Sequence, residues 1–288
     1  MLIEIKNGEN MKIVLKCPVC DEPLNRFDKV FSCPKRHSFD IAIKGYVNLL
    51  LANQTHSEAS GDSKMMIEAR ERFLKTDKYS CLKNQIIEII KEYASIDIVF
   101  GDMSCGEGYY TNSIHKHFLD HGYDISTYGI DISKAGINAC SIKQRALKLD
   151  NLLFIIGNLF YLPFLNDSFD VLLNCFAKIE KEEFLRCLKK NGIYIRVLPN
   201  KEHLLNMKQI LYENVYLNEE KEEEIQGFSL LKKVEVNDEI ELNNQEIIDL
   251  FMMTPYYYKS SKERAERLCK LNYLKTKISF SILVYRKE

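Results

Sequence analysis

The central and C-terminal parts of the chain alternate between short apolar runs and longer amphipathic segments. Five runs rich in β-branched residues predict buried strands at 96–102, 125–133, 152–158, 168–176 and 192–200. The segment 104–118 predicts a tight turn that enters a helix, and the segments after the second and fourth runs predict helices at 134–147 and 181–190. Strands that alternate with helices pair in parallel through right-handed crossovers. The pattern therefore predicts an α/β fold with a parallel sheet covered on both faces.

Two more amphipathic segments precede this region. Apolar residues recur at helical spacing over 63–74, where Ser63 is placed to cap the first turn, and again over 82–94. The polar, glycine-containing stretch 55–62 predicts a surface loop. We therefore expect three parts: an N-terminal module at 1–50, connecting helices at 51–95, and the α/β domain at 96–288.

Composition narrows the class of protein. A chain of 288 residues with 46% hydrophobic residues is large enough for one sizeable domain with an appendage. The net charge of -1 means that any nucleic-acid partner must be met by a local basic patch. No run is long and apolar enough to span a bilayer, and no signal peptide is recognisable. We expect a cytoplasmic protein without a membrane partner; its oligomeric state stays open, with a homodimer as one option.

Three cysteines and a histidine lie close together in CPVCDEPLNRFDKVFSCPKRH. Cys17 and Cys20 form one pair at ligand spacing, and Cys33 and His37 form a second. Two such pairs separated by a loop are typical of a tetrahedral zinc site, and four protein ligands make it structural. The alternatives are chance proximity and a redox Cys-x-x-Cys motif, which normally opens a helix after a strand. Because cytosolic thiols stay reduced, disulfides are not expected.

The turn after the first predicted strand, DMSCGEGYY, is a candidate ligand site. Gly106 and Gly108 allow close backbone approach, and ligands of parallel sheets bind at the carboxyl ends of the strands. Asp131 ends the second strand, where a carboxylate can accept both ribose hydroxyls of an adenosine. An N-cap role for Asp131 is the alternative. Asn158 follows the third strand, where it is placed to bond an adenine edge.

The Leu-Pro-Phe turn in NLFYLPFLNDSFDVLL completes a resemblance to S-adenosylmethionine-dependent methyltransferases of the Rossmann-like class. Asp102, Gly106 and Gly108 match the glycine-rich motif of that class, and Asp131 matches its ribose carboxylate. Ser104 stands where the motif usually has glycine. The turn lacks G-x-G-x-x-G, which argues against the alternative of a NAD-type domain. The resemblance implies a cofactor site made of Asp102, Ser104, Gly106, Gly108, Tyr110, Asp131, Asn158 and Leu159.

Nearly the whole chain resembles the bacterial 23S ribosomal RNA (guanine-N1)-methyltransferases with an N-terminal zinc finger. The motifs are CPVC, SCPKRHSFD, KGYVNLL, GDSKMMIEARERFL, CGEGYYT, YGIDISKAGI, LPF and MTPYYY. The resemblance implies a class I methyltransferase fold with a mostly parallel seven-stranded sheet and a small zinc-binding module. It also implies S-adenosylmethionine and zinc as cofactors, and N1 of a guanine in a 23S ribosomal RNA hairpin loop as the target.

Residues after the fourth predicted strand are candidates to face the acceptor base. Asn174 is placed to bind the base edge, and Lys178 is placed to polarise the guanine carbonyl. A solvated surface position is an equal alternative for Lys178. Methylation of a purine nitrogen needs no cysteine nucleophile, so Cys175 is expected in the core. Aromatic walls for an extruded base are sought in Tyr109 and Tyr110, and in the segment 256–258, for which a core position is an equal alternative.

Basic residues gather in the N-terminal module and the first predicted helix. They are Lys29, Lys35, Arg36, Lys44, Arg70, Arg72 and Lys75. Such charges are usually solvated surface, but their clustering favours an RNA partner. No DNA partner is expected. Two other functions remain open. A small-molecule methyltransferase would need no zinc finger. A zinc-bearing RNA-binding protein with a vestigial cofactor pocket is supported only by Ser104.

Overall fold

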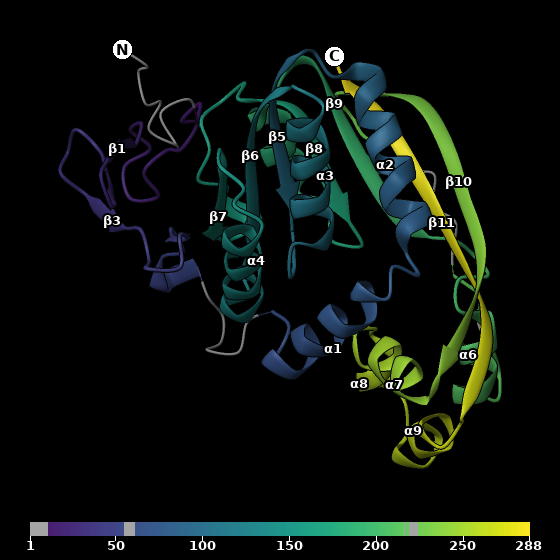
Figure 1. The fold of residues 1–288 in the computed structure, drawn as a ribbon. Helices are drawn as coiled ribbons and strands as arrows, with labels where there is room; N and C mark the ends of the chain where they lie inside the picture. Colours follow the sequence, from purple (N-terminus) through teal and green to yellow (C-terminus); the bar gives the residue numbers. More distant parts are fainter. Residues whose placement is uncertain (1–10, 55–60, 216, 219–223) are drawn as a thin grey trace.

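An eight-stranded sheet forms the centre of the molecule in the computed structural model, which describes residues 11–54, 61–215, 217–218 and 224–288. Its order is β10-β11-β9-β8-β5-β6-β7-β4 (Figure 1). The strands are β4 (Val47–Asn48), β5 (Asp97–Met103), β6 (Asp124–Asp131), β7 (Leu152–Ile156), β8 (Phe169–Cys175), β9 (Leu188–Pro199), β10 (Phe228–Asn243) and β11 (Tyr273–Lys287). Neighbours from β4 to β9 pair in parallel, and β11 runs antiparallel to both β9 and β10. Seven strands make the predicted methyltransferase sheet, and β4 extends it from the N-terminal module.

The N-terminal module contains a small antiparallel sheet of its own. Its strands are β1 (Asn25–Phe27), β2 (Val30–Ser32) and β3 (Ser38–Asp40). The module lies beside β7 at one end of the molecule (Figure 1). Two backbone pairings join it to the large sheet: Val47 of β4 pairs with Ile155 of β7, and Leu15 bridges to Phe164. The module is therefore built onto the sheet edge.

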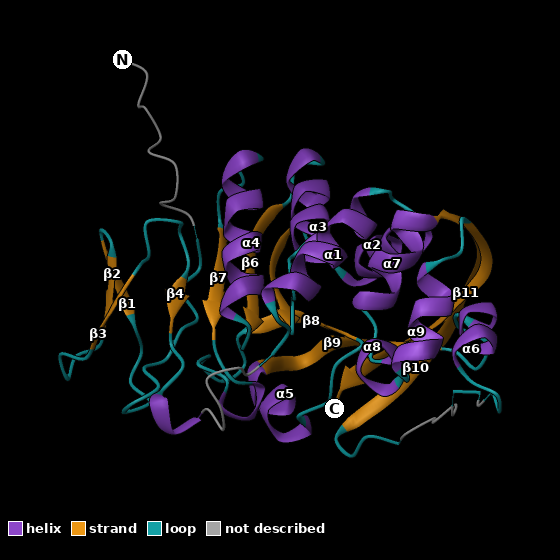
Figure 2. Ribbon diagram, turned by 90° about the horizontal axis from the view of Figure 1, so that it is seen from below, coloured by secondary structure: helices purple, strands orange, loops and turns teal. Residues whose placement is uncertain are grey.

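Helices cover both faces of the large sheet, as predicted. They are α1 (Lys64–Lys75), α2 (Ser80–Tyr93), α3 (Tyr109–Asp120), α4 (Lys134–Ala146), α5 (Lys181–Cys187), α6 (Leu205–Leu211), α7 (Asn244–Met252), α8 (Tyr256–Lys259) and α9 (Lys262–Cys269), with 3-10 turns η1 (Ala52–Gln54) and η2 (Leu159–Tyr161). Figure 2 shows α2, α3 and α4 on one side of the sheet and α5 on the other. None of the helices in the described residues is both long and apolar enough to cross a bilayer.

Helix α1 begins as the sequence predicts, with the Ser63 hydroxyl accepting from the Met66 amide at 3.3 Å. Its apolar side packs mainly on α7, which belongs to the helical segment between β10 and β11. The predicted loop at 55–62 lies largely outside the described residues. In Figure 1, α1 crosses beyond the carboxyl ends of the central strands, beside α7 and α8. It therefore lies over the edge where ligands of such sheets bind.

One predicted helix is too long. The helix expected at 181–190 ends at Cys187, and β9 begins at Leu188. Leu188 adopts extended backbone angles, is fully buried, and pairs with Phe169 of β8. Lys189 adds an ion pair to Asp170 at 2.8 Å. Strand pairing and burial outweigh the helical spacing of the apolar residues here.

Candidate functional site

The four predicted metal ligands lie together in the N-terminal module. Their ligand atoms all lie within 4.8 Å of one another. Cys20 Sγ and Cys33 Sγ are 3.7 Å apart, and His37 Nδ1 is 3.5 Å from Cys17 Sγ and 3.4 Å from Cys33 Sγ. Zinc–sulfur bonds of about 2.3 Å at tetrahedral angles place ligand atoms about 3.6–3.8 Å apart. The cluster therefore has the dimensions of a closed tetrahedral zinc site.

Tight turns shape both halves of this cluster. The Asp21 amide donates to the Cys17 carbonyl, and the Arg36 amide donates to the Cys33 carbonyl, each at 2.9 Å. Asp21 and Arg36 both have left-handed backbone angles, with φ of 60° and 69°. These turns direct the side chains of each pair to the same side. The first pair therefore lies in a turn, and not at the start of a helix as in a redox Cys-x-x-Cys motif.

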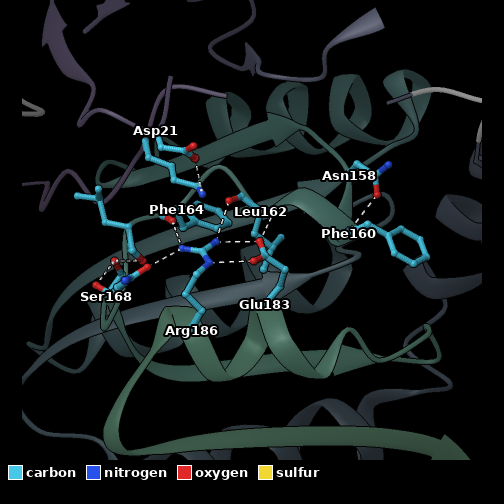
Figure 3. Close-up of polar contacts among 11 residues, drawn as sticks. Asp21, Asn158, Phe160, Leu162, Phe164, Ser168, Glu183 and Arg186 are labelled. Atoms are coloured by element: carbon cyan, nitrogen blue, oxygen red, sulfur yellow. Dashed lines mark hydrogen bonds and ion pairs between the residues drawn. The ribbon is translucent and has the colours of Figure 1, made fainter. Parts of the chain in front are cut away.

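The Leu-Pro-Phe turn links this module to the large sheet (Figure 3). Arg186 of α5 donates to the Phe164 carbonyl at 2.6 Å and to the Leu162 carbonyl at 3.0 Å. Glu183 accepts from the Leu162 amide at 2.6 Å and pairs with Arg186. On its other side, Phe164 bridges to Leu15 just before the first zinc ligand. The turn thus holds the zinc module in register with the sheet.

The glycine-rich turn between β5 and α3 has the backbone expected of a ligand cradle. Ser104, Gly106 and Gly108 all have positive φ, at 79°, 58° and 78°. A side chain on Gly108 would meet Asn112 Nδ2 at 2.7 Å and Cys140 Sγ at 2.9 Å. Only glycine fits at that position. Ser104 takes the left-handed conformation that glycine would adopt without strain, so the departure from the motif changes the cost of the turn and not its shape.

Asp131 connects the end of β6 to this turn. Its carboxylate accepts from the Gly106 amide at 3.0 Å and from the Ser133 amide at 2.8 Å. The N-cap of α4 is Ser133, whose hydroxyl accepts from the Gly136 amide at 3.2 Å. The alternative role of Asp131 as that cap is therefore wrong. Burial raises the pKa of Asp131, and the two backbone donors oppose this rise.

Asp102 ends β5 with a buried carboxylate. Thr111 donates to Oδ2 at 2.5 Å, whereas Oδ1 is buried and accepts no hydrogen bond within the described ranges. Burial raises the pKa of Asp102 from 3.8 to about 7; Thr111 opposes this rise, and Asp131 and Glu107 add to it. A buried acceptor without a donor is costly, and a cationic donor would satisfy it. The ammonium group of S-adenosylmethionine fits this requirement.

The remaining predicted cofactor residues lie around the same edge of the sheet. Asn158 caps η2 by accepting from the Phe160 amide at 3.0 Å (Figure 3). Its amide nitrogen donates to the Gln54 carbonyl at 2.9 Å. Its side chain therefore already has local partners, and Leu159 begins η2 beside it. The Tyr110 hydroxyl is buried without a hydrogen-bond partner in the part of the chain that the structure describes.

The segment after β8 holds the predicted acceptor-facing residues. Asn174 is buried and donates to the carbonyls of Met103 at 3.1 Å and Lys178 at 3.3 Å, so it joins the ends of β5 and β8. The Lys178 side chain is exposed, ahead of α5. Burial raises the pKa of the Cys175 thiol, which suits a core residue and not a nucleophile.

Phe176 is a candidate that sequence reasoning missed. It has a φ of 59°, and its side chain is 45% exposed although it follows a buried strand. Bulky residues seldom adopt left-handed angles, and such strain often accompanies function. No local sequence signal marks this conformation, because it depends on how the chain leaves β8.

The tyrosines of α8 divide between core and surface. Tyr256 is buried, with the Lys208 ammonium 5.7 Å from its ring centre. Tyr258 is exposed, and its hydroxyl lies 2.9 Å from Met66 Sδ of α1. At the start of α3, as predicted, the Tyr109 hydroxyl donates to Asp77 at 2.8 Å. Of these aromatic residues, Tyr256 belongs to the core.

The predicted RNA-facing cations differ in their surroundings. Lys29 and Arg36 are exposed, and their side chains make no ion pair or hydrogen bond with any residue that the structure describes. Lys35 pairs with Glu22 at 3.3 Å, and Lys44 donates to Asn138 at 2.6 Å.

The two arginines of α1 are both held in ion pairs. Arg72 pairs with Asp249 at 2.6 Å, and Arg70 pairs with Asp62 at 2.6 Å beside the glycine turn. Sequence reasoning assigned Arg70 to RNA; the structure places it at the candidate cofactor site. The sequence signal was the single motif that contains both residues: Asp62 precedes α1, and Arg70 lies in its middle, from where it reaches Asp62.

The sheet, the glycine turn and the acidic strand ends define a class I S-adenosylmethionine-dependent methyltransferase. Residues 96–247 match the family "Methyltransferase domain", and residues 15–58 match "RlmA, N-terminal", a zinc ribbon. The methyl donor of this class is S-adenosylmethionine, and the ribbon's metal is zinc.

Curated relatives give the particular family. A Bacillus subtilis (strain 168) protein named "Putative 23S rRNA (guanine-N(1)-)-methyltransferase YxjB" is 29% identical over 95% of this chain and 97% of its own. A Micromonospora griseorubida protein named "Putative 23S rRNA (guanine-N(1)-)-methyltransferase" is 30% identical over 67% of this chain and 68% of its own. A Streptomyces fradiae "23S rRNA (guanine(748)-N(1))-methyltransferase" is 26% identical over 70% and 69%. The chain belongs to the family of 23S ribosomal RNA (guanine-N1)-methyltransferases.

Proposed function

We propose that the protein transfers the methyl group of S-adenosylmethionine to N1 of a guanine in a hairpin loop of 23S ribosomal RNA. The observation that carries this proposal is the attachment of a zinc ribbon to the β7 edge of a methyltransferase sheet. β4 and the bridge from Leu15 to Phe164 fix the ribbon beside the carboxyl edge where the cofactor residues gather. A small-molecule methyltransferase has no need of such a module.

Access to the target atom supports a loop substrate. N1 lies on the Watson–Crick edge of guanine, so a base-paired guanine must leave its helix before it can react. An unpaired loop base needs no such step, and it can stack on exposed aromatic side chains. Phe176 and Tyr258 are exposed aromatic residues beyond the carboxyl ends of the central strands.

The cofactor supplies an electrophilic methyl group; the chain binds, orients and excludes water. Asp102 would accept from the donor's ammonium through Oδ1, and Asp131, which holds the Gly106 amide, would accept from the ribose. Both contacts would orient the donor at the carboxyl edge of the sheet.

Guanine N1 carries a proton that must leave during the transfer. Asn174 Oδ1 is buried and accepts no hydrogen bond within the described residues, so it is an acceptor near the reacting edge. Lys178 is exposed after β8, and we assign it the polarisation of the guanine carbonyl. Polarisation of that carbonyl would lower the pKa of N1, so that N1 loses its proton to water as the N1–methyl bond forms and the sulfur–methyl bond breaks.

Primer extension on ribosomal RNA from cells with and without the gene tests this function. A methyl group at N1 blocks base pairing and stops reverse transcriptase one nucleotide before the modified guanine. We expect one stop in a 23S hairpin loop that disappears with the gene and returns when the gene is restored. The same stops in both strains would contradict the proposal.

A further inference from the structure

Arg70 of α1 reaches the glycine turn from above. Its Nη1 atom lies 3.2 Å from the point that a Cβ on Gly106 would occupy. Its Nη2 atom pairs with Asp62 at 2.6 Å, and the side chain remains 22% exposed. The guanidinium thus borders the place where the backbone leaves room for a ligand, and it stays open to solvent.

Most of the hydrogen-bonding capacity of Arg70 is unused by the protein. A guanidinium has five N–H donors in a rigid fork. Across the residues that the structure describes, Asp62 is its only ion-pair partner, and no hydrogen bond engages Nη1 or Nε. A fork with free donors at the mouth of a site suits a planar anion with two oxygens, such as a carboxylate.

Arg72, two residues further along the same helix, shows the contrasting case. Its Nε and Nη2 atoms donate to both oxygens of Asp249, at distances from 2.6 to 3.1 Å. Asp249 is buried under α1, so this pair docks α1 on α7. Arg72 therefore has a structural role, and its fork is already matched to a carboxylate.

The charges around the turn explain why a cation is needed there. Asp62, Glu107 and Asp131 all interact electrostatically with Arg70. Lys143, another cation near the turn, lies 3.8 Å from Glu71 and donates to the Glu107 carbonyl. The sulfonium and ammonium groups of S-adenosylmethionine suit this acidic surrounding. Its carboxylate does not, unless it meets a cation with free donors.

We propose that Arg70 binds the carboxylate of the methionine part of S-adenosylmethionine. This assignment rests on the proposed use of that cofactor and adds a residue from outside the sheet to its site. Asp62 holds the guanidinium over Gly106 before the cofactor arrives, and the free donors of the fork receive the cofactor's carboxylate. Helix α1 thereby makes the site selective for ligands that have a carboxylate.

The assignment is tested by comparing the affinities of two ligands, with and without a carboxylate, for the wild type and matched variants. The ligands are S-adenosylmethionine and decarboxylated S-adenosylmethionine, which keeps the sulfonium and the amine. Calorimetry gives both dissociation constants for the wild type, Arg70→Gln, Arg70→Lys and the control Arg72→Gln. Thermal unfolding of each cofactor-free variant confirms that it is folded, and Arg70→Lys, which retains the charge, serves if Arg70→Gln is unstable.

We expect the wild type to prefer the carboxylated ligand by roughly tenfold or more, as a charge-assisted contact provides. Arg70→Gln should bind both ligands about equally, Arg70→Lys should keep part of the preference, and Arg72→Gln should keep all of it. A preference retained in Arg70→Gln overturns the assignment while leaving the proposed function intact. Equal weakening of both ligands also overturns it, because the role would then be structural. A wild type that binds neither ligand overturns the proposed function as well.

Discussion

Buried carboxylates at the glycine turn dominate the chemistry at the scale of single residues. Burial raises the pKa of Asp102, Glu107 and Asp131. The charge of Arg70 opposes this rise at Glu107 and Asp131. Asp102 instead has a neutral donor, Thr111, and one oxygen without a donor in the described part of the chain. Asp102 is therefore the carboxylate whose ionisation depends most on a bound cation.

The affinity for S-adenosylmethionine should depend on pH through Asp102. Its pKa rises from 3.8 to about 7 in the folded protein, and a cationic ligand favours the ionised form. Affinity should therefore increase as pH rises through about 7 and fall below it, by up to about tenfold per pH unit. Calorimetry between about pH 6 and 8 measures this. Asp102→Asn should bind weakly at every pH, and Asp124→Asn, an exposed change at the other end of β6, should behave as the wild type.

The raised pKa of Asp102 also affects the stability of the cofactor-free protein, which should fall with rising pH whereas the cofactor affinity rises. The folded protein holds a proton on Asp102 that the unfolded chain releases near pH 4, so the cofactor-free fold loses stability as pH rises from about 4 to about 7 and carries the full penalty above that. Asp102→Asn should then raise the thermal midpoint at about pH 8 more than at about pH 5. Equal shifts at both pH values, or affinity that does not vary with pH in the wild type, would contradict this account of Asp102.

Ser104 should carry measurable strain. Its φ of 79° costs an L-residue about 1–2 kcal/mol. Glycine avoids this cost, but it loses more conformational entropy on folding, which offsets part of the gain. Ser104→Gly should therefore stabilise the cofactor-free protein by about 0.5–1 kcal/mol, or about 1–3 °C in thermal midpoint. Ser104→Ala keeps the Cβ and should gain nothing. Equal midpoints for the two variants would show that the turn is not strained there.

At the scale of elements, the hydrophobic pattern of the sequence correctly predicted the strands and helices whose formation depends on nearby residues. The strands β5 to β9 are apolar because both faces are covered, and Ser63 caps α1 through its own first turn. The sequence analysis overlooked β11, although its buried residues 278–285 form a largely apolar run. The long strand β10 was not predicted, because much of it is polar and exposed and its pairing with β11 joins residues far apart in sequence. The pairing of β4 with β7 and the contact of Arg70 with the glycine turn are long-range for the same reason.

Zinc should hold the N-terminal module and its edge strand together. A structural zinc contributes on the order of 10 kcal/mol to the folding of a small module. Chelation should therefore increase amide hydrogen exchange across 11–48 and along β7, which loses its partner β4. The inner strands β5 and β8 should remain protected, and added zinc should restore the original pattern. Unchanged exchange after elemental analysis shows that the metal is gone would contradict the zinc assignment.

At the scale of the whole molecule, the zinc module lies at one end and the helices α6, α7, α8 and α9 lie at the other, with the glycine turn between them (Figure 1). Lys29, Lys35, Arg36 and Lys44 are all exposed on the module. Phosphate contacts made by such residues position an RNA, while a pocket elsewhere selects the base. The module is therefore suited to hold ribosomal RNA at a fixed distance from the cofactor edge.

The two unpaired cations should contribute more to RNA binding than the two engaged ones. Replacement of Lys29 and Arg36 by Gln should weaken binding and lower the salt slope by about 1.5, because each phosphate contact contributes about 0.7–0.9. Lys35 and Lys44 are held by Glu22 and Asn138, so their replacement should do less. Filter binding over a range of salt measures both. Equal effects, or a changed affinity for S-adenosylmethionine, would contradict this role.

The central claim is tested most directly by the product of the purified enzyme. Zinc-loaded protein is incubated with methyl-labelled S-adenosylmethionine and unmodified 23S ribosomal RNA, which is then digested to nucleosides and analysed by mass spectrometry. We predict about one methyl group per RNA, recovered as 1-methylguanosine, and no label on free guanosine. Label on another atom or base, or transfer to free nucleosides as readily as to the RNA, would contradict the account.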